Sequence, residues 1–332
     1  MKIRHSAQNA SKILLPLVLA AAILWWMYRG FLWDDVRQAL ESEMSWRWML
    51  LSFPFGIMAQ VLRAIRWKQV LTPLGEKPRL LTCINAIFIS YASSLAVPRV
   101  GEMLRCGILR RWEGTNLSRS IGTVVTERII DSVMVVLLAV VTVCFQIPLF
   151  MKIFAETGVS LQGILGSFTT TGYLVTVLCG LLILCTGAVL VWRLNLFSRT
   201  RAVLTDLKDG LFSVRRVQNP ALFLLYSVGI WVCYYFHFYL TFFCFPYTAS
   251  LGGMAALVAF VVGCFAVIVP TPNGAGPWHF AVKTVLVLYG VSQAGAAIFV
   301  LVVHTVQTLL VVALGLLGAA ALFLTKKKSR KS

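Results

Sequence analysis

Charged side chains are scarce in this chain. Asp, Glu, Lys and Arg make up 13% of its 332 residues and hydrophobic residues 59%, whereas about 25% of the residues in soluble domains are charged. The apolar residues recur in long runs from residue 12 to residue 325, which excludes a soluble domain with one membrane anchor. These runs lack the alternation of a transmembrane barrel, so the composition predicts an all-α polytopic membrane protein.

Acidic residues are especially few. The chain has 12 Asp and Glu against 30 Lys and Arg, a net charge of +18. The basic residues fall mainly on alternate connections between apolar runs, as the positive-inside rule describes. Because no aromatic and basic platform accompanies them, we expect no nucleic-acid partner.

Metal and disulfide spacings are also missing. The four histidines are dispersed, and no C-x-x-C pair occurs. We therefore expect no metal site, no cofactor and no disulfide framework. The eight cysteines lie mostly in apolar runs and are predicted to be small buried residues: Cys83, Cys106, Cys144, Cys179, Cys185, Cys233, Cys244 and Cys264.

Enzyme signatures are absent as well. The sequence has no Walker A, G-x-S-x-G or G-x-G-x-x-G motif. Its longest polar connection, 193–219, is too short to hold a nucleotide. No catalytic residue is therefore predicted, and any transport would run downhill or be coupled to ions or the membrane potential.

The apolar runs define nine candidate spans. Both ends of the chain are basic, with Lys2, Arg4 and Lys12 at one end and the tail 325–332 at the other. Both termini are therefore expected on the cytoplasmic side, and the protein is expected in the cytoplasmic (inner) membrane. Two ends on one side require an even number of crossings. The candidates are 12–29, 48–66, 80–97, 119–147, 171–192, 220–245, 251–269, 277–291 and 294–324.

Two regions are better explained as re-entrant pairs of half-helices. Basic clusters flank 80–97 on both sides, and Pro98 and Gly101 mark a break, so 80–111 is predicted to enter and leave on the cytoplasmic side. A second break at 270–277 holds three prolines and two glycines, so 251–291 is predicted to dip in from the outer side.

The resulting topology is an inverted repeat with about six full crossings. The first repeat is 12–147, an outer linker follows at 148–170, and the second repeat is 171–324 with its order upside down. An alternative in which each apolar run is a simple span stays open. The basic loop 193–219 is predicted either to lie on anionic inner-leaflet lipids or to be a plain linker.

The stretch 118–147 carries three charges inside an apolar run: Glu127, Arg128 and Asp131. A charge in a lipid-embedded helix costs about 2.5–3.5 kcal/mol on insertion scales, so such residues usually face a protein interior or a polar cargo. Glu127 and Asp131 share one helix face. They are candidate substrate-binding residues, and a purely structural ion cluster is the alternative.

The first break adds Arg99, Glu102 and Arg105. Half-helices that end in a cavity expose amides that attract anions, and arginine binds phosphate with two hydrogen bonds. Glu102 could orient an arginine or meet a cationic headgroup. A cytoplasmic loop whose charges only orient the protein is the alternative.

The second break adds Asn273, Gly274 and Gly276, where the glycines permit close backbone approach. His279 and Lys283 follow four residues apart on one helix face. A ligand role and a structural role for His279 are equally open.

The last span adds His304 and Gln307, three residues apart on one face. The helix that carries them mirrors 118–147 in the predicted repeat. They complete the candidate binding residues, although hydrogen bonding between helices would also explain them.

Three motifs together resemble those of the lysylphosphatidylglycerol synthase transmembrane (flippase-like) family. They are 98–105 (PRVGEMLR), 126–131 (TERIID) and 270–276 (PTPNGAG). Many members carry one more residue between the first proline and arginine, and a glycine in place of Asn273. The resemblance implies a lipid flippase or lipid-handling carrier, expected here without the aminoacyl-transferase domain of the synthases.

The sequence thus predicts a translocator of a polar, phosphate-bearing lipid, with membrane phospholipids or polyprenyl-phosphate lipids as partners. Two alternatives stay open. One is a membrane transferase with a lipid-phosphate donor, for which Asp34 and Asp35 are the only acidic candidates. The other is a scaffold for envelope synthesis that transports nothing.

Overall fold

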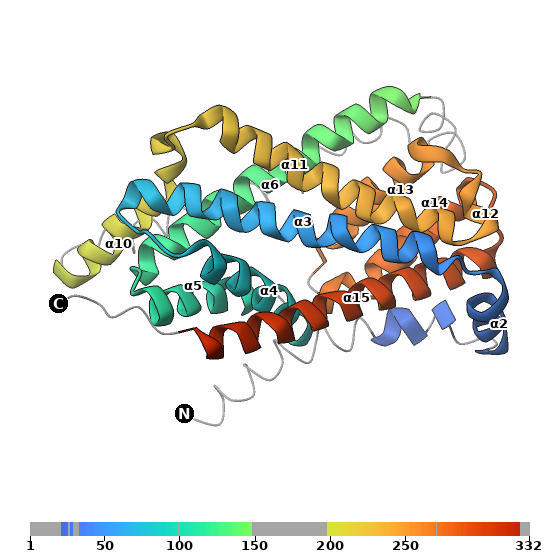
Figure 1. Cartoon of the computed structure of the whole chain (residues 1–332). Coiled ribbons are helices and arrows are strands. Elements are labelled where there is room, and N and C mark those ends of the chain that lie inside the picture. Colours follow the sequence, from blue (N-terminus) through green and yellow to red (C-terminus); the bar gives the residue numbers. More distant parts are fainter. Residues whose placement is uncertain are drawn as a thin grey trace, which may run out of the picture.

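The structure is a computed structural model that describes residues 21–25, 27–28, 33–97, 100–147, 198–269 and 271–325. Every regular element in these ranges is a helix. Figure 1 shows them as an elongated bundle with α3 and α11 side by side along its length. The prediction of an all-α membrane protein is confirmed for this part of the chain.

Four of the described helices are long and apolar enough to cross a membrane. The 32 residues of α15 span about 48 Å at 1.5 Å per residue, more than the hydrocarbon core of about 30 Å. The four are α3 (Trp46–Leu71) continued by η2 (Thr72–Leu74), α6 (Leu117–Phe145), α11 (Pro220–Tyr239) continued by η4 (Leu240–Cys244), and α15 (Gln293–Leu324).

Two pairs of shorter helices stand between the long ones. The first pair is α4 (Leu80–Ala96) with α5 (Val100–Glu113), and the second is α13 (Gly252–Ala266) with α14 (Pro277–Leu288). The helices of each pair pack against each other. Helices of 12 to 17 residues reach only about 18–26 Å, which is less than the hydrocarbon core.

The start of α4 and the end of α5, which are the two ends of the first pair away from the break, lie together. Arg79, directly before α4, places its Nε 2.7 Å from Oε1 of Glu113, the last residue of α5. The hydroxyl of Thr82 donates to the same carboxylate oxygen. The pair therefore ends where it begins.

The first break differs in one detail from the sequence prediction. Gly101 lies in the first turn of α5 rather than in the break itself. A Cβ at this position would overlap the main-chain carbonyl of Ser90 on α4. Gly101 thus permits the close approach of the two helices. Pro98 in this break and Pro270 in the second lie outside the described residues.

Each pair also packs against a long helix from the other end of the chain. α4 packs on α15, and α13 packs on α6. Gly315 and Gly318 of α15 face α4, where a Cβ at Gly315 would overlap the side chain of Ala92. Small residues of this kind let membrane helices approach closely. An inverted repeat would produce this reciprocal packing, although the inversion itself stays a prediction.

The basic loop 193–219 contains α10 (Ser198–Leu211) and η3 (Ser213–Arg216). α10 packs on α6 where Gly210 meets Gly122, and Asp206 accepts hydrogen bonds from Arg119 and Asn116. Asn116 also caps the start of α6. The contact with anionic lipid stays a prediction because the side chains of 198–204 are outside the described set.

The remaining described elements are short. They are α2 (Trp33–Gln38), η1 (Ala39–Glu43), α12 (Pro246–Ala249) and η5 (Pro272–Gly274). Most of the predicted spans 12–29 and 171–192, the linker 148–170 and all but the first residue of the tail 325–332 lie outside the described residues.

Candidate functional site

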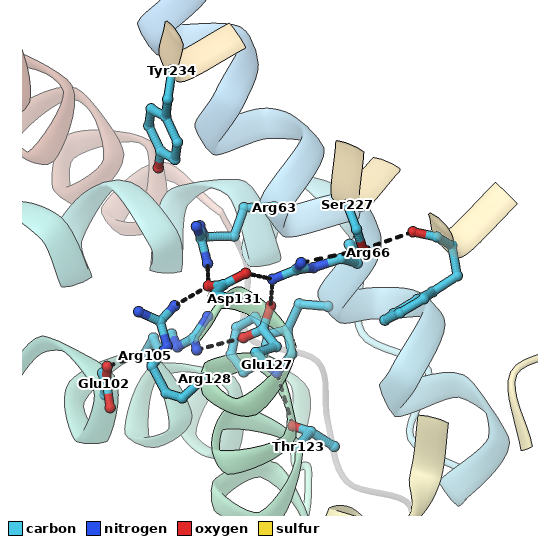
Figure 2. A network of polar contacts seen from close by, with 12 residues as sticks. Arg63, Arg66, Glu102, Arg105, Thr123, Glu127, Arg128, Asp131, Ser227 and Tyr234 are labelled. Carbon is cyan, nitrogen blue, oxygen red and sulfur yellow. Dashed lines mark hydrogen bonds and ion pairs between the residues drawn. The ribbon is translucent and has the colours of Figure 1, made fainter. Parts of the chain in front are cut away.

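The carboxylate of Asp131 on α6 is held by three arginines. Its Oδ2 lies 2.5 Å from Nη1 of Arg63 and 3.1 Å from Nη2 of Arg128, and its Oδ1 lies 2.7 Å from Nη2 of Arg66. Figure 2 shows Arg63 and Arg66 reaching Asp131 from α3. Charge-assisted hydrogen bonds of this length are strong, so α3 and α6 are tied together here.

Glu127, one turn earlier on α6, is fully buried. Its Oε2 lies 2.5 Å from Nη2 of Arg105 on α5, and its Oε1 lies 3.6 Å from Nη2 of Arg66. The guanidinium of Arg105 also lies over the ring of Trp67, 4.5 Å from its centre. Trp67 in turn donates to the hydroxyl of Thr123. Arg105 is thus fixed by an ion pair on one side and an aromatic ring on the other.

Glu102 on α5 is held more loosely. Its Oε1 lies 3.5 Å from Nε of Arg128. The side chain of Glu102 is 35% exposed and that of Arg128 43%, whereas that of Glu127 is 0% exposed. This pair therefore forms the accessible edge of the network.

A cavity of about 190 Å³ opens beside that edge. Arg63, Glu102, Arg105 and Arg128 line it on one side, so the charged network supplies its wall. Helix α4 adds the hydroxyl groups of Ser90, Tyr91 and Ser94 to the lining.

The second break adds Val267, Thr271, Asn273 and Gly274 to the lining. Asn273 has a φ of 52°, in the left-handed region that asparagine tolerates better than most residues. Its side-chain amide donates to the hydroxyl of Thr308 on α15 at 2.8 Å. Residues of the helices that flank the first break and residues of the second break, more than 160 positions apart in sequence, thus line one cavity.

Next to the second break lies a group of aromatic and histidine rings. The ring centres of His279 and His304 are 4.4 Å apart, and the ring centre of Trp278 lies 5.2 Å from that of His304. The carbonyl of Asn273 accepts from Nε2 of His304 at 3.1 Å, and His279 contacts the backbone N–H of Gly276. These contacts hold the second break against α14 and α15.

The structure thus gathers five predicted site residues on one cavity: Glu102, Arg105, Arg128, Asn273 and Gly274. Glu127 and Asp131 lie behind the wall and hold its arginines. Gly276, His279 and His304 form the adjoining group.

Two predicted residues stand apart from this cavity, and a third is not described. The amide of Gln307 donates to the carbonyl of His237 on α11. Lys283 is half-buried on α14 and does not line the cavity. Arg99 lies outside the described residues. Substrate contact by any of the predicted residues stays a prediction.

The sequence analysis missed Arg63 and Arg66, which it counted only as cytoplasmic flanking charges. Both are buried inside α3, which runs one turn beyond the predicted span 48–66. Gln60, Arg63 and Arg66–Trp67 recur at helical spacing, so they fall on one face. That polar stripe in an apolar helix was the available signal.

Tyr234 on α11 was also missed as a neighbour of the site. Its hydroxyl lies 3.0 Å from that of Tyr91, and its ring lies 5.8 Å from the guanidinium of Arg63. Among the described residues no group of three or more His, Cys, Asp or Glu gathers as metal ligands would. The site is therefore an arginine-rich polar cavity inside an apolar helical bundle.

Fold and site define an α-helical, multi-pass integral membrane protein with a buried charged centre. The chain belongs to the family described as the lysylphosphatidylglycerol synthase TM region, whose model matches residues 13–315. The resemblance found from the three motifs is thereby confirmed. No curated protein matches the sequence. Membership of this family indicates a membrane role connected with lipids.

Proposed function

We propose that this protein is a lipid translocator that moves a phosphate-bearing headgroup across the membrane. One observation carries the proposal: residues of the helices that flank the first break and residues of the distant second break line one arginine-lined cavity. Broken helices that meet at a polar site are a recurrent feature of secondary transporters. Family membership supports a lipid as the cargo.

In this proposal α4–α5 and α13–α14 are re-entrant pairs that enter from opposite sides. Their helices are too short to cross the hydrocarbon core, and the contact of Arg79 with Glu113 supports a common side for both ends of the first pair. The long helices, together with 12–29 and 171–192, then supply six crossings. Both termini are cytoplasmic, and the membrane is the inner membrane of a bacterium.

The arginines of the wall bind the phosphate. Arg63, Arg105 and Arg128 line one cavity, and guanidinium groups match phosphate oxygens in pairs. Glu127 and Asp131 fix these arginines in position.

The acyl or isoprenoid tails stay in the membrane while the headgroup moves. Met103 and Ile268, which follow the cavity-lining residues Glu102 and Val267 in the sequence, are exposed apolar side chains. Exposed apolar surface of this kind suits lipid tails rather than water. The movement is downhill or coupled to ions or the membrane potential.

The test is headgroup translocation in proteoliposomes. Labelled phosphatidylglycerol, phosphatidylethanolamine, aminoacyl lipid and polyprenyl phosphate are compared for wild type, Arg128→Gln and the matched control Arg216→Gln. Arg128 lies at the cavity, whereas Arg216 forms an exposed pair with Asp209. Selective movement of one lipid, lost only in Arg128→Gln, is the expected result.

Absence of movement above empty vesicles, from well-folded wild-type protein, would overturn the translocator assignment. The transferase and the scaffold would then be the functions to examine. If the wild type does move a lipid, equal rates for Arg128→Gln and Arg216→Gln would remove Arg128 from the site.

A further inference from the structure

The charges of the network do not cancel. Among the described residues it joins four guanidinium groups to three carboxylates, which leaves one positive charge in surplus: Arg63, Arg66, Arg105 and Arg128 against Glu102, Glu127 and Asp131. The residues that the second break adds to the lining, Val267, Thr271, Asn273 and Gly274, carry no charge. The net charge of the cavity lining therefore comes from the network.

Hydrogen-bond donors are in surplus too. Asp131 receives arginine donors on both oxygens, and both oxygens of Glu127 lie within ion-pair distance of a guanidinium. Of the network's buried atoms, one carboxylate oxygen, Oε1 of Glu127, has no hydrogen bond in the described part of the chain. Five arginine donors also have none: Nε of Arg63, Arg66 and Arg128, and Nε and Nη1 of Arg105. Arg105 is 2% exposed and lines the cavity. A buried guanidinium with unused donors requires an acceptor, because an unmet buried donor is costly.

Glu102 is the only carboxylate among the described residues that lines the cavity. Its single arginine contact, 3.5 Å to Arg128, is longer than the 2.5 Å contact between Glu127 and Arg105. An anion that enters the cavity would meet Arg128 at the position that the Glu102 carboxylate now faces. Glu102 and such an anion therefore compete for one guanidinium.

From these observations we propose that the cavity selects a lipid phosphodiester headgroup with one net negative charge, and that Glu102 occupies Arg128 until the phosphate replaces it. This rests on the proposed function in that both use the same cavity. One negative charge matches the surplus of the network. A cationic group on the headgroup would face a wall whose ion-pair network carries one net positive charge, and like charges repel strongly in a medium of low dielectric constant.

The experiment is equilibrium binding to the full-length protein in phosphatidylcholine nanodiscs. Short-chain phosphatidylglycerol, phosphatidylethanolamine and lysyl-phosphatidylglycerol carry one negative charge, none and one positive charge. Phosphatidylglycerol is expected to bind about tenfold tighter than the other two or better, as charge complementarity of this kind allows. Inorganic phosphate and glycerophosphoglycerol serve as competitors without tails and are expected to bind far more weakly.

Glu102→Gln removes the competing carboxylate and keeps nearly the same shape. It is expected to raise the affinity for phosphatidylglycerol several-fold. The matched control is Glu41→Gln, because Glu41 pairs with the exposed Arg37 and does not line the cavity. The selectivity of the wild type is a separate readout that needs no variant to fold.

Equal or tighter binding of the cationic lipid would overturn the proposed selectivity. Weaker binding of phosphatidylglycerol by Glu102→Gln would overturn the role of Glu102. Inorganic phosphate that binds as well as the lipid would assign the cavity to a free anion instead.

This result and the transport assay can disagree in an informative way. Selective binding without translocation would reject the translocator and keep the anion site. Translocation of all lipids without charge preference would keep the translocator and reject the charge-selective site.

Discussion

Arg105 and Glu127 form a fully enclosed ion pair, with 2.5 Å between Nη2 and Oε2 and side chains 2% and 0% exposed. The pair joins the second helix of the first short pair to the neighbouring long helix α6. Removal of one partner of such a pair leaves the other charge buried and uncompensated. The two residues therefore hold the cavity wall in place as well as shaping its charge.

Glu127→Gln is expected to destabilise the protein by about 3–5 kcal/mol, because Arg105 would lose its closest ion-pair partner in a buried site. Unfolding of the purified variant in detergent, followed by tryptophan fluorescence, measures this loss. Glu41→Gln is the control, since its ion pair with Arg37 is exposed. A Glu127→Gln variant of unchanged stability that still fails to transport would instead make Glu127 a direct ligand.

Gly101→Ala is expected to cost about 1–3 kcal/mol of stability, because the added methyl group would overlap the carbonyl of Ser90 and force α4 and α5 apart. Gly107→Ala on the same helix is a matched control, because nothing lies within 4 Å of its Cβ position. There alanine should stabilise α5 by about 0.5–1 kcal/mol. The midpoints of thermal unfolding of the two variants, compared with wild type, measure these opposite effects. Equal midpoints would show that the close contact at Gly101 is unimportant.

Asn273→Ala and Asn273→Gly separate two roles of one residue. Both remove the hydrogen bond to Thr308, worth about 1 kcal/mol. Only alanine adds strain at a φ of 52°, and left-handed backbone costs a non-glycine residue about 1–2 kcal/mol. Alanine should therefore be the less stable variant in the same unfolding assay. Thr308→Val tests the hydrogen bond alone, and stability equal to wild type would exclude this bond as an anchor of the second break.

Single cysteines test the re-entrant topology, in a background whose native cysteines have been replaced. Lys77→Cys and Arg111→Cys flank the first pair, and Ser250→Cys and Gln293→Cys flank the second; all four sites are exposed. A membrane-impermeant thiol reagent should label the first two from the cytoplasmic side and the last two from the outer side. Opposite labelling within either pair would show that it crosses the membrane.

The sequence predicted the helices and breaks well because both depend on local chemistry. Apolar runs long enough to span a bilayer give α6 and α15, and proline with glycine ends helices near residues 98 and 270. From the sequence, Arg66 was interpreted as a charge at the membrane surface and Glu127 as a candidate site residue. In the structure, Nη2 of Arg66 lies 3.6 Å from Oε1 of Glu127. A charge near the end of an apolar run usually marks the membrane surface. Only its partner on another helix reveals that Arg66 is buried.

Contacts between distant segments could not be derived from the sequence. Asn273 and Arg105 face one cavity although they are far apart in the chain. Hydropathy determines which segments enter the membrane but not which of their faces meet. The sequence therefore pointed to five charged residues of the network, Glu102, Arg105, Glu127, Arg128 and Asp131, whereas Arg63, Arg66 and the neighbouring Tyr234 required the three-dimensional structure.

The reciprocal packing of the two short pairs has a consequence for biosynthesis. The face of α4 that fits Gly315 and Gly318 cannot form this contact until α15, the last of the described long helices, has left the ribosome. The packing of α4 on α15 therefore forms only after the carboxy-terminal half has been synthesised. A chain truncated before α15 would lack this interface.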